Sequence, residues 1–209
     1  KAAVLQFVAS IDFNELNKSF KEFKNSKFEN KRFFFLPNQF WQHKNHLTVF
    51  KSILELKKRG HEIKLFCSGY MEDYRNKEYI FILKKFILDN KLQNNVELLG
   101  VIPYSQLYLL MCKSICVINP SLFEGWSTTV EECKSLSKNI ILSDLKVHKE
   151  QNPLGYYFSP MNYLELADIM EKQWLLIENR NIMIDTIDLE SEVKKRLINM
   201  AKTYESIID

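Results

Sequence analysis

Two glutamates eight residues apart, Glu124 and Glu132, are the side chains of this chain best placed to do chemistry. They belong to the stretch NPSLFEGWSTTVEEC, which follows a short apolar run. This pattern predicts a buried strand, a sharp turn and the start of a helix, with Ser127 or Thr128 as N-cap and Glu131 in a capping-box position. A capped helix after a buried strand would by itself explain most of these residues.

The same stretch also suits a phosphorylated ligand. A helix N-terminus offers free backbone N–H groups and the positive end of the helix dipole, and both favour phosphate. Carboxylates repel phosphate but accept hydrogen bonds from sugar hydroxyls. Amides for phosphate, flanked by two carboxylates for hydroxyls, therefore indicate a nucleotide-sugar as the ligand.

The surrounding elements predict an α/β fold, a doubly wound parallel sheet with helices on both faces. Short, continuously apolar runs alternate with amphipathic segments, as is typical of strands covered by helices on both sides. We expect strands at residues 32–37, 62–67, 94–100, 115–118, 139–142 and 156–158. We expect helices at residues 46–59, 78–90, 103–112, 127–136, 163–177 and 190–208. Ligands of such folds bind at the carboxyl ends of the strands, near a topological switch point.

The chain divides into two parts of different character. Residues 1–31 are interpreted as an N-terminal or inter-domain segment, with a strand at residues 2–8 and a weak helix at residues 14–23. Residues 32–209 are interpreted as one Rossmann-like, nucleotide-sugar-binding domain. Because the chain begins with Lys, we expect it to be a piece of a longer protein.

Composition excludes several classes of function. A net charge of +3 is too small for nucleic-acid binding or a polybasic membrane surface. No apolar run approaches the roughly 20 residues that span a bilayer. The four cysteines lack metal-ligand spacing, which favours a reduced, cytoplasmic setting.

The loops after the strands hold the remaining candidates. No glycine-rich dinucleotide or P-loop motif is present, so phosphate would need a ligand such as Lys44, although a solvated lysine explains that residue equally well. His43 and His46 have a spacing found in metal sites, but no third ligand is near, and His43 fits better as a hydrogen-bond donor to a ligand. Trp126 either stacks on a ligand ring or packs against the sheet edge, and His148 is interpreted as structural or as a helix-start residue.

Three motifs together resemble family GT4 of the retaining glycosyltransferases, which have the two-domain GT-B architecture. FEGWSTTVEE resembles the E-x7-E signature of the family, from Glu124 to Glu132. LPNQFWQHKNH resembles its first-strand loop, which carries a diphosphate-binding Lys, here Lys44. Residues 143–150 and the later YFSP resemble its late loop. The resemblance covers about residues 32–178 and implies the C-terminal, donor-binding half of such an enzyme.

The resemblance implies a role for each matching residue. Glu124 and Lys44 would be the catalytic pair, with Glu124 orienting sugar hydroxyls without acting as a nucleophile and Lys44 neutralising the diphosphate. Glu132 would bond the ribose hydroxyls. The other donor-binding residues would be Gly125, Trp126, Ser127 and Thr128 at the turn, His43 and Gln39 in the first loop, and Ile102 and Pro103, with Val101, at the base.

Two departures from the family pattern matter. Gln39 stands where the family commonly has an Arg, and Ser127 replaces the usual second Gly. A subgroup with Asn-Gln-Phe-Trp in this loop would explain the first change. A non-catalytic nucleotide-sugar-binding or partner-binding module stays open as an alternative. A flavodoxin-like regulatory domain would need an acidic cluster at the strand ends, where only Asp144 is available.

The resemblance finally implies a setting. The enzyme would be of the hexosyltransferase type and would move a sugar from a UDP- or GDP-sugar to a glycan or glycolipid acceptor with retention of configuration. The process would be polysaccharide or lipopolysaccharide assembly. No cofactor and no metal are required. The expected partners are the donor, the acceptor and the missing N-terminal domain, with no nucleic acid. The expected place is the cytoplasm or the inner face of the membrane, with peripheral association through the other domain.

Overall fold

The apolar run Phe33–Leu36 shows how the sheet is built. Successive side chains of a strand point to opposite faces, so Phe33 and Phe35 enter one hydrophobic cluster while Phe34 and Leu36 enter another. All four residues are fully buried. Burying a large apolar side chain contributes roughly 1.5–3 kcal/mol, so a strand of this kind is stable only when helices cover both of its faces.

The computed structural model describes residues 6–23, 26–29, 31–151, 153–176 and 186–208. Six parallel strands form one sheet in the order β3-β2-β1-β4-β5-β6. The strands are β1 (Phe34–Leu36), β2 (Leu65–Ser68), β3 (Val96–Gly100), β4 (Val117–Asn119), β5 (Ile140–Ser143) and β6 (Gly155–Phe158). The predicted doubly wound parallel sheet is confirmed, and its switch point lies between β1 and β4.

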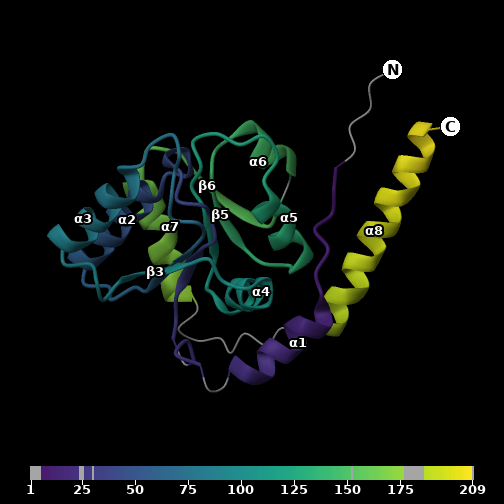
Figure 1. The fold of residues 1–209 in the computed structure, drawn as a ribbon, viewed down its shortest axis with the longest axis horizontal. Coiled ribbons are helices and arrows are strands. Elements are labelled where there is room, and N and C mark those ends of the chain that lie inside the picture. Colours follow the sequence, from purple (N-terminus) through teal and green to yellow (C-terminus); the bar gives the residue numbers. More distant parts are fainter. Residues whose placement is uncertain (1–5, 24–25, 30, 152, 177–185, 209) are drawn as a thin grey trace.

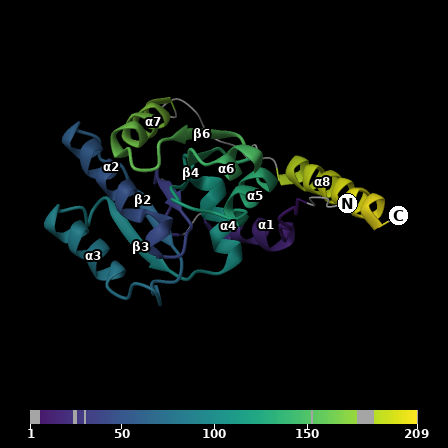
Figure 2. The same ribbon diagram turned by 90° about the horizontal axis from the view of Figure 1, so that it is seen from above.

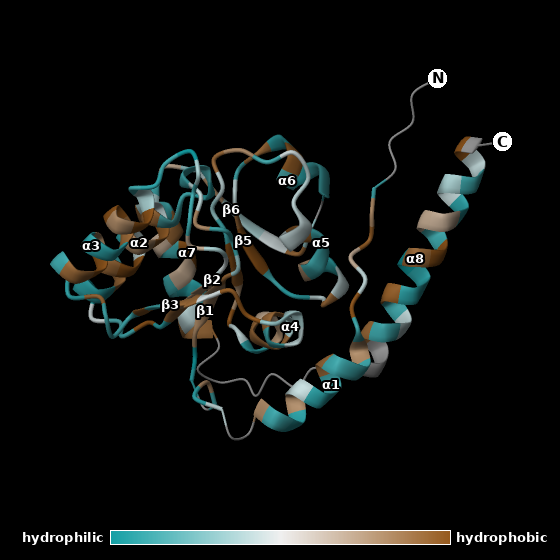
Figure 3. Cartoon of the chain, viewed as in Figure 1, coloured by the Kyte–Doolittle hydropathy of each residue, from teal (hydrophilic) through white to brown (hydrophobic). Residues whose placement is uncertain are grey.

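Helices cover the two faces of the sheet as separate groups (Figures 1 and 2). One face packs against α2 (His46–Lys58), α3 (Tyr79–Asp89) and α7 (Tyr163–Leu176). The other face packs against α1 (Phe13–Glu22), α4 (Tyr104–Lys113), α5 (Thr128–Ser135) and α8 (Thr186–Ile208). Figure 3 shows hydrophobic colour on the central strands and alternating hydrophobic and polar colour along α8.

Most predicted elements lie within a few residues of those in the structure, with three differences. The loop predicted after β5 contains a helix, α6 (Lys146–Gln151), and the loop after β1 contains a 3-10 helix, η2 (Gln42–Lys44). A helix of six residues is too short to show a helical period in the sequence. Of the strand predicted at residues 2–8, residues 6–8 form no strand, and residues 2–5 lie outside the described residues.

The described part of the N-terminal segment packs on the same core as the sheet. Phe13 and Leu16 of α1 and Phe28 after it join the cluster that contains Phe35, and α1 lies against α4. Asp12 caps α1 by accepting hydrogen bonds from the amides of the next turn. The proposed domain boundary at residue 31 stays a prediction.

The loops after β1 and β2 approach each other too closely for any residue but glycine at position 69. Gly69 has φ +148°, and a Cβ there would stand 2.4 Å from the carbonyl oxygen of Asn38. The two loops are therefore packed backbone to backbone at the carboxyl edge of the sheet.

Among the described residues, no helix has the length and the apolar character needed to span a bilayer.

Candidate functional site

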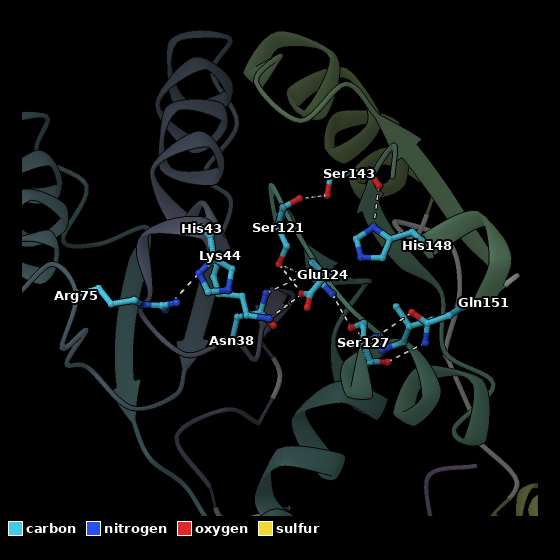
Figure 4. Close-up of polar contacts among 12 residues, drawn as sticks. Asn38, His43, Lys44, Arg75, Ser121, Glu124, Ser127, Ser143, His148 and Gln151 are labelled. Atoms are coloured by element: carbon cyan, nitrogen blue, oxygen red, sulfur yellow. Dashed lines mark hydrogen bonds and ion pairs between the residues drawn. The ribbon is translucent and has the colours of Figure 1, made fainter. Parts of the chain in front are cut away.

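An ion pair crosses the switch point of the sheet. Lys44, at the end of η2, places its Nζ 2.7 Å from Oε1 of Glu124, in the loop after β4 (Figure 4). Only 15% of the Lys44 side chain and 9% of the Glu124 side chain are exposed. Ser121 donates a hydrogen bond of 2.7 Å to the same carboxylate oxygen. Two loops that are 80 residues apart in sequence thus meet through one cation and one carboxylate.

Buried amides link the ends of β1 and β4 to the start of α5. Asn38 donates to Oδ1 of Asn119 at 3.0 Å, and Asn119 donates to Oγ of Ser127 at 2.9 Å. The same Oγ accepts the Val130 amide, which makes Ser127 the N-cap of α5. The chain of hydrogen bonds fixes the position of the α5 N-terminus relative to the sheet.

The first turn of α5 presents backbone amides at this edge. The Ser127 amide donates to Oε1 of Gln151, and the Gln151 side-chain amide donates back to the Ser127 carbonyl, at 3.0 and 2.9 Å. Within the described part of the chain, the amides of Thr128 and Thr129 donate to no protein acceptor. Gly125 is exposed, with nothing within 4 Å of the position of a Cβ. Together these groups can receive an anion.

The predicted capping box is not formed. Because Ser127 and not Thr128 is the N-cap, Glu131 lies one position too late to bond back to the cap residue. Its buried carboxylate instead pairs with Arg196 at 2.9 Å and Lys134 at 3.2 Å and accepts from Gln151. Glu131 thereby ties α5 to α8 and is structural.

Glu132 is a buried carboxyl with no protein partner among the described residues. It is 7% exposed, and no hydrogen bond or ion pair between described residues uses its side chain. Burial raises the pKa of Glu132 to about 7. A mostly buried carboxyl without a partner among the described residues is suited to accept hydrogen bonds from ligand hydroxyls.

His43 lies between the Lys44–Glu124 ion pair and the Arg75–Asp73 ion pair. Its carbonyl accepts the Leu122 amide at 2.8 Å, and its Nδ1 lies 3.4 Å from Nη2 of Arg75, which is bound to Asp73. Burial, followed by the nearby cations Lys44 and Arg75, lowers the pKa of His43. Because Arg75 can only donate, the neutral ring carries its proton on Nε2, which has no partner among the described residues. Donation from Nε2 to a ligand stays a prediction.

His46 belongs to the core. It is fully buried between Phe40, whose ring stacks at 4.4 Å, and Phe50, and burial lowers its pKa to about 3. The described residues contain no group of three or more His, Cys, Asp or Glu placed to hold a metal ion.

The remaining predicted residues lie along the same edge and differ in their exposure and in their hydrogen-bond partners. Gln39 is exposed, and its Oε1 accepts the Tyr70 amide at 2.6 Å. Trp126 is half-buried, and its indole N–H has no partner in the described residues. Ile102 packs against the core while Pro103 is exposed as the residue before α4. Among the described residues, no hydrogen bond or ion pair joins Gln39 or these β3-loop residues to the Lys44–Glu124 pair.

Sequence reasoning missed the buried polar residues that hold the site. Asn38, Asn119, Ser121 and Gln151 were not singled out as functional. The first three lie at the carboxyl ends of β1 and β4 or directly after them, and that position was the available signal. Gln151 had none, because it acts from α6, which was predicted as a loop.

A doubly wound sheet with these loops at its switch point is the architecture of one half of a GT-B glycosyltransferase. The chain belongs to the family of glycosyl transferases group 1, whose model matches residues 17–187. The resemblance read from the three motifs is thereby confirmed at the level of this family.

Curated and solved relatives agree with the family. The chain is 24% identical over 141 residues to the O-antigen chain mannosyltransferase RfbU of Salmonella typhimurium. A glycosyltransferase from Rickettsia africae is similar in structure with a TM-score of 0.68 and 19% identity over 94% of this chain. Anabaena Alr3699/HepE, solved in complex with UDP and glucose, has a TM-score of 0.63 and 14% identity over 90% of this chain. At these identities the structural likeness shows the fold alone.

The chain spans only part of these proteins. It covers 37% of the mannosyltransferase, 52% of the Rickettsia protein and 54% of the Anabaena protein.

Proposed function

We propose that this chain is the donor-binding half of a retaining glycosyltransferase, and that it binds a nucleotide-diphosphate sugar at the β1–β4 switch point. The observation that carries the proposal is the convergence of Lys44, Glu124 and the N-terminus of α5 at one edge of the sheet. One cation and a set of helix-start amides suit a diphosphate, and the carboxylate suits a sugar hydroxyl. The UDP and glucose bound by the structurally similar Anabaena protein support this class of ligand.

Each part of the donor has a matching group. Lys44 and the amides around Gly125 and Thr128 would hold the diphosphate. Glu124 would orient hydroxyls of the donor sugar. Glu132, one turn into α5, would accept from the ribose hydroxyls, and the loop at Ile102 would line the base.

Ser127 supports this arrangement from within the protein. Its hydroxyl caps α5 and its amide is held by Gln151, so neither group is free in this structure. A direct contact between Ser127 and the donor stays a prediction.

The chemistry requires that developing charge on the leaving diphosphate be stabilised as the glycosidic bond to it breaks. Lys44 and the α5 amides are fixed before the ligand arrives, so they would stabilise that charge without reorganisation, at a few kcal/mol per donor. Glu124 is already engaged by a cation and a hydroxyl, which fits an orienting role rather than that of a nucleophile. The acceptor, a glycan or glycolipid of polysaccharide or O-antigen assembly, and any general base would come from the rest of the protein. No metal or cofactor is part of the proposal.

Calorimetric titration of the chain with UDP, GDP and their sugar conjugates tests the proposal. We expect one nucleotide series to bind and to raise the melting temperature, because a ligand of the native state stabilises it. Lys44→Gln should weaken binding of the nucleoside diphosphate by roughly 10- to 100-fold, since it removes a charge-assisted hydrogen bond. Lys51→Gln, an exposed lysine on α2, is the matched control. Absence of binding by every nucleoside diphosphate, or equal binding by Lys44→Gln, would overturn the proposal.

A second candidate, a non-catalytic nucleotide-sugar-binding module, is favoured by Gln39. This neutral, exposed side chain is already bonded to the Tyr70 amide, so it adds no cation to the site. The two candidates differ in turnover. The full-length protein of the second kind would bind the donor and never release free nucleoside diphosphate from it.

A further inference from the structure

His148 is a buried histidine whose proton can be placed from its contacts. It lies in the first turn of α6 and is 0% exposed. Its Nδ1 is 2.8 Å from the carbonyl oxygen of Ser143, at the end of β5. A carbonyl oxygen only accepts, so Nδ1 carries the proton of the neutral ring and Nε2 carries a lone pair.

The lone pair on Nε2 has no partner among the described residues, and this atom is fully buried. Burial also lowers the pKa of His148, so the ring stays neutral near pH 7. A buried acceptor without a donor costs the desolvation of that acceptor, and native structures rarely leave such a group unused.

The helix that carries His148 is docked on the start of α5. Gln151, one turn later on the same helix, clamps the amide and the carbonyl of Ser127. Figure 4 shows the imidazole bonded to Ser143 on one side, with its other side facing Glu124 and Ser127. The nearby charges of Glu124 and Lys44 shift the pKa of His148 in opposite directions, Glu124 upward and Lys44 downward. The unpartnered nitrogen thus belongs to the edge where the ion pair lies.

The chemistry of the nitrogen decides what it can bind. A diphosphate carries no hydrogen to donate near neutral pH, and its oxygens would repel the lone pair. A hydroxyl can donate, and the nucleotide-sugar has hydroxyls on its ribose and on its sugar. In Figure 4 the imidazole faces Glu124, the carboxylate proposed for hydroxyls of the donor sugar.

We propose that Nε2 of His148 accepts a hydrogen bond from a hydroxyl of the donor sugar, so that the site prefers the nucleotide-sugar over the nucleoside diphosphate alone. This inference rests on the proposed function. His148 and Glu124 then form a pair of acceptors, one neutral and one charged, for hydroxyls of one sugar ring. Neither group forms a covalent bond to it.

Substitutions can separate the two nitrogens of the ring. In His148→Asn the side-chain amide can still donate to Ser143, but no acceptor remains at the position of Nε2. In His148→Gln the longer side chain can place an amide oxygen near that position. His61→Asn is the matched control. His61 is bonded to Glu171 of α7 and has no proposed role at the site.

The experiment measures dissociation constants for UDP, UDP-glucose, GDP and GDP-mannose with each form of the chain. Wild type should bind at least one nucleotide-sugar about fivefold or more tightly than its nucleoside diphosphate, the gain expected of one hydrogen bond. His148→Asn should bring this ratio to about one and leave the nucleoside diphosphate affinity within about twofold. His148→Gln should keep part of the preference, and His61→Asn all of it. Melting curves identify a variant that does not fold. The binding ratio of the other His148 variant then tests the proposal.

Different failures have different meanings. A wild-type ratio near one for both sugars, or an unchanged ratio in the folded His148 variants, overturns the role of His148. Loss of nucleoside diphosphate affinity in parallel with nucleotide-sugar affinity does the same, because it shows a merely structural residue. If wild type binds no nucleoside diphosphate at all, the proposed function itself has failed.

Discussion

Replacing Glu132 by Gln should make the protein more stable at alkaline pH while removing a proposed ligand of the ribose. The carboxyl is buried without a partner in the part of the chain that the structure describes, and its pKa rises from 4.5 to about 7. Ionising it therefore costs roughly 3 kcal/mol more in the folded than in the unfolded chain, at about 1.4 kcal/mol per pH unit.

The sign of the pH dependence follows from proton counts. Between pH 4.5 and 7 the folded chain holds the Glu132 proton while the unfolded chain has lost it. The free energy of unfolding therefore falls as the pH rises through this window, and the cost is fully present above pH 7. Gln has no proton to lose, so Glu132→Gln should match wild type near pH 4 and exceed it at pH 8 by up to roughly 3 kcal/mol.

Thermal unfolding followed by near-ultraviolet circular dichroism, at pH values from about 4.5 to 8.5, measures this difference. For a domain of this size roughly 3 kcal/mol corresponds to about 6–12 °C in Tm. The exposed Glu22→Gln at the end of α1 is the control and should leave the curve parallel to wild type. A difference that does not change with pH, or a Glu132→Gln variant less stable than wild type at pH 8, would refute the reasoning. Titration of the same variant with nucleoside diphosphates should show weakened binding despite its higher Tm.

Three further outcomes are expected from the geometry. Gly69→Ala should lower the free energy of unfolding, measured by urea titration, by roughly 2–4 kcal/mol, because a Cβ would lie 2.4 Å from a backbone oxygen. Gly125→Ala is the control, and it should change the free energy of unfolding little because its Cβ would face open space. Ser127→Ala should cost roughly 1–2 kcal/mol by the same measurement, since α5 loses its N-cap. Arg75→Gln should raise the pKa of His43, followed by NMR of its ring protons, because a neighbouring positive charge is removed; an unchanged pKa would show that the two side chains do not interact in solution.

The sheet could be predicted from sequence because its strands are apolar on both faces. Runs such as Phe33–Leu36 carry the signal within a few residues, and their alternation with amphipathic helices fixes a parallel, doubly wound order. That arrangement places the loops of Lys44 and Glu124 at one edge, since the carboxyl ends of parallel strands share an edge of the sheet. The motif resemblance named their roles, which stay predictions.

The supporting contacts could not be predicted in the same way. Asn38 and Asn119 are 81 residues apart, and which polar residue meets which depends on register and on side-chain direction. The capping box predicted for Glu131 does not form because the N-cap is Ser127, and the partner that Glu131 has instead, Arg196, comes from a helix 65 residues later. Tertiary ion pairs of this kind override a local pattern.

The pairing between β1 and β4 is the shortest of the strand pairings in the sheet. Within the described residues only Phe35 and Val117 are aligned across it, whereas three or four residue pairs are aligned across each of the other joins. On either side of that pair the two halves are connected by single backbone bonds, from the Ile115 amide to Phe33 at 2.7 Å and from the Leu122 amide to His43 at 2.8 Å. Side chains add to them, including the bond from Asn45 to the carbonyl of Pro120 at 3.0 Å.

The shortest strand pairing of the sheet therefore ends directly at the carboxyl edge where the candidate site lies. Lys44 lies on the β1 side of this pairing, and Glu124 and the start of α5 lie on its β4 side. A ligand bound by groups from both sides would link the two halves of the sheet. We therefore expect ligand binding to slow amide exchange in β1 and β4, because it stabilises the native state that holds them together.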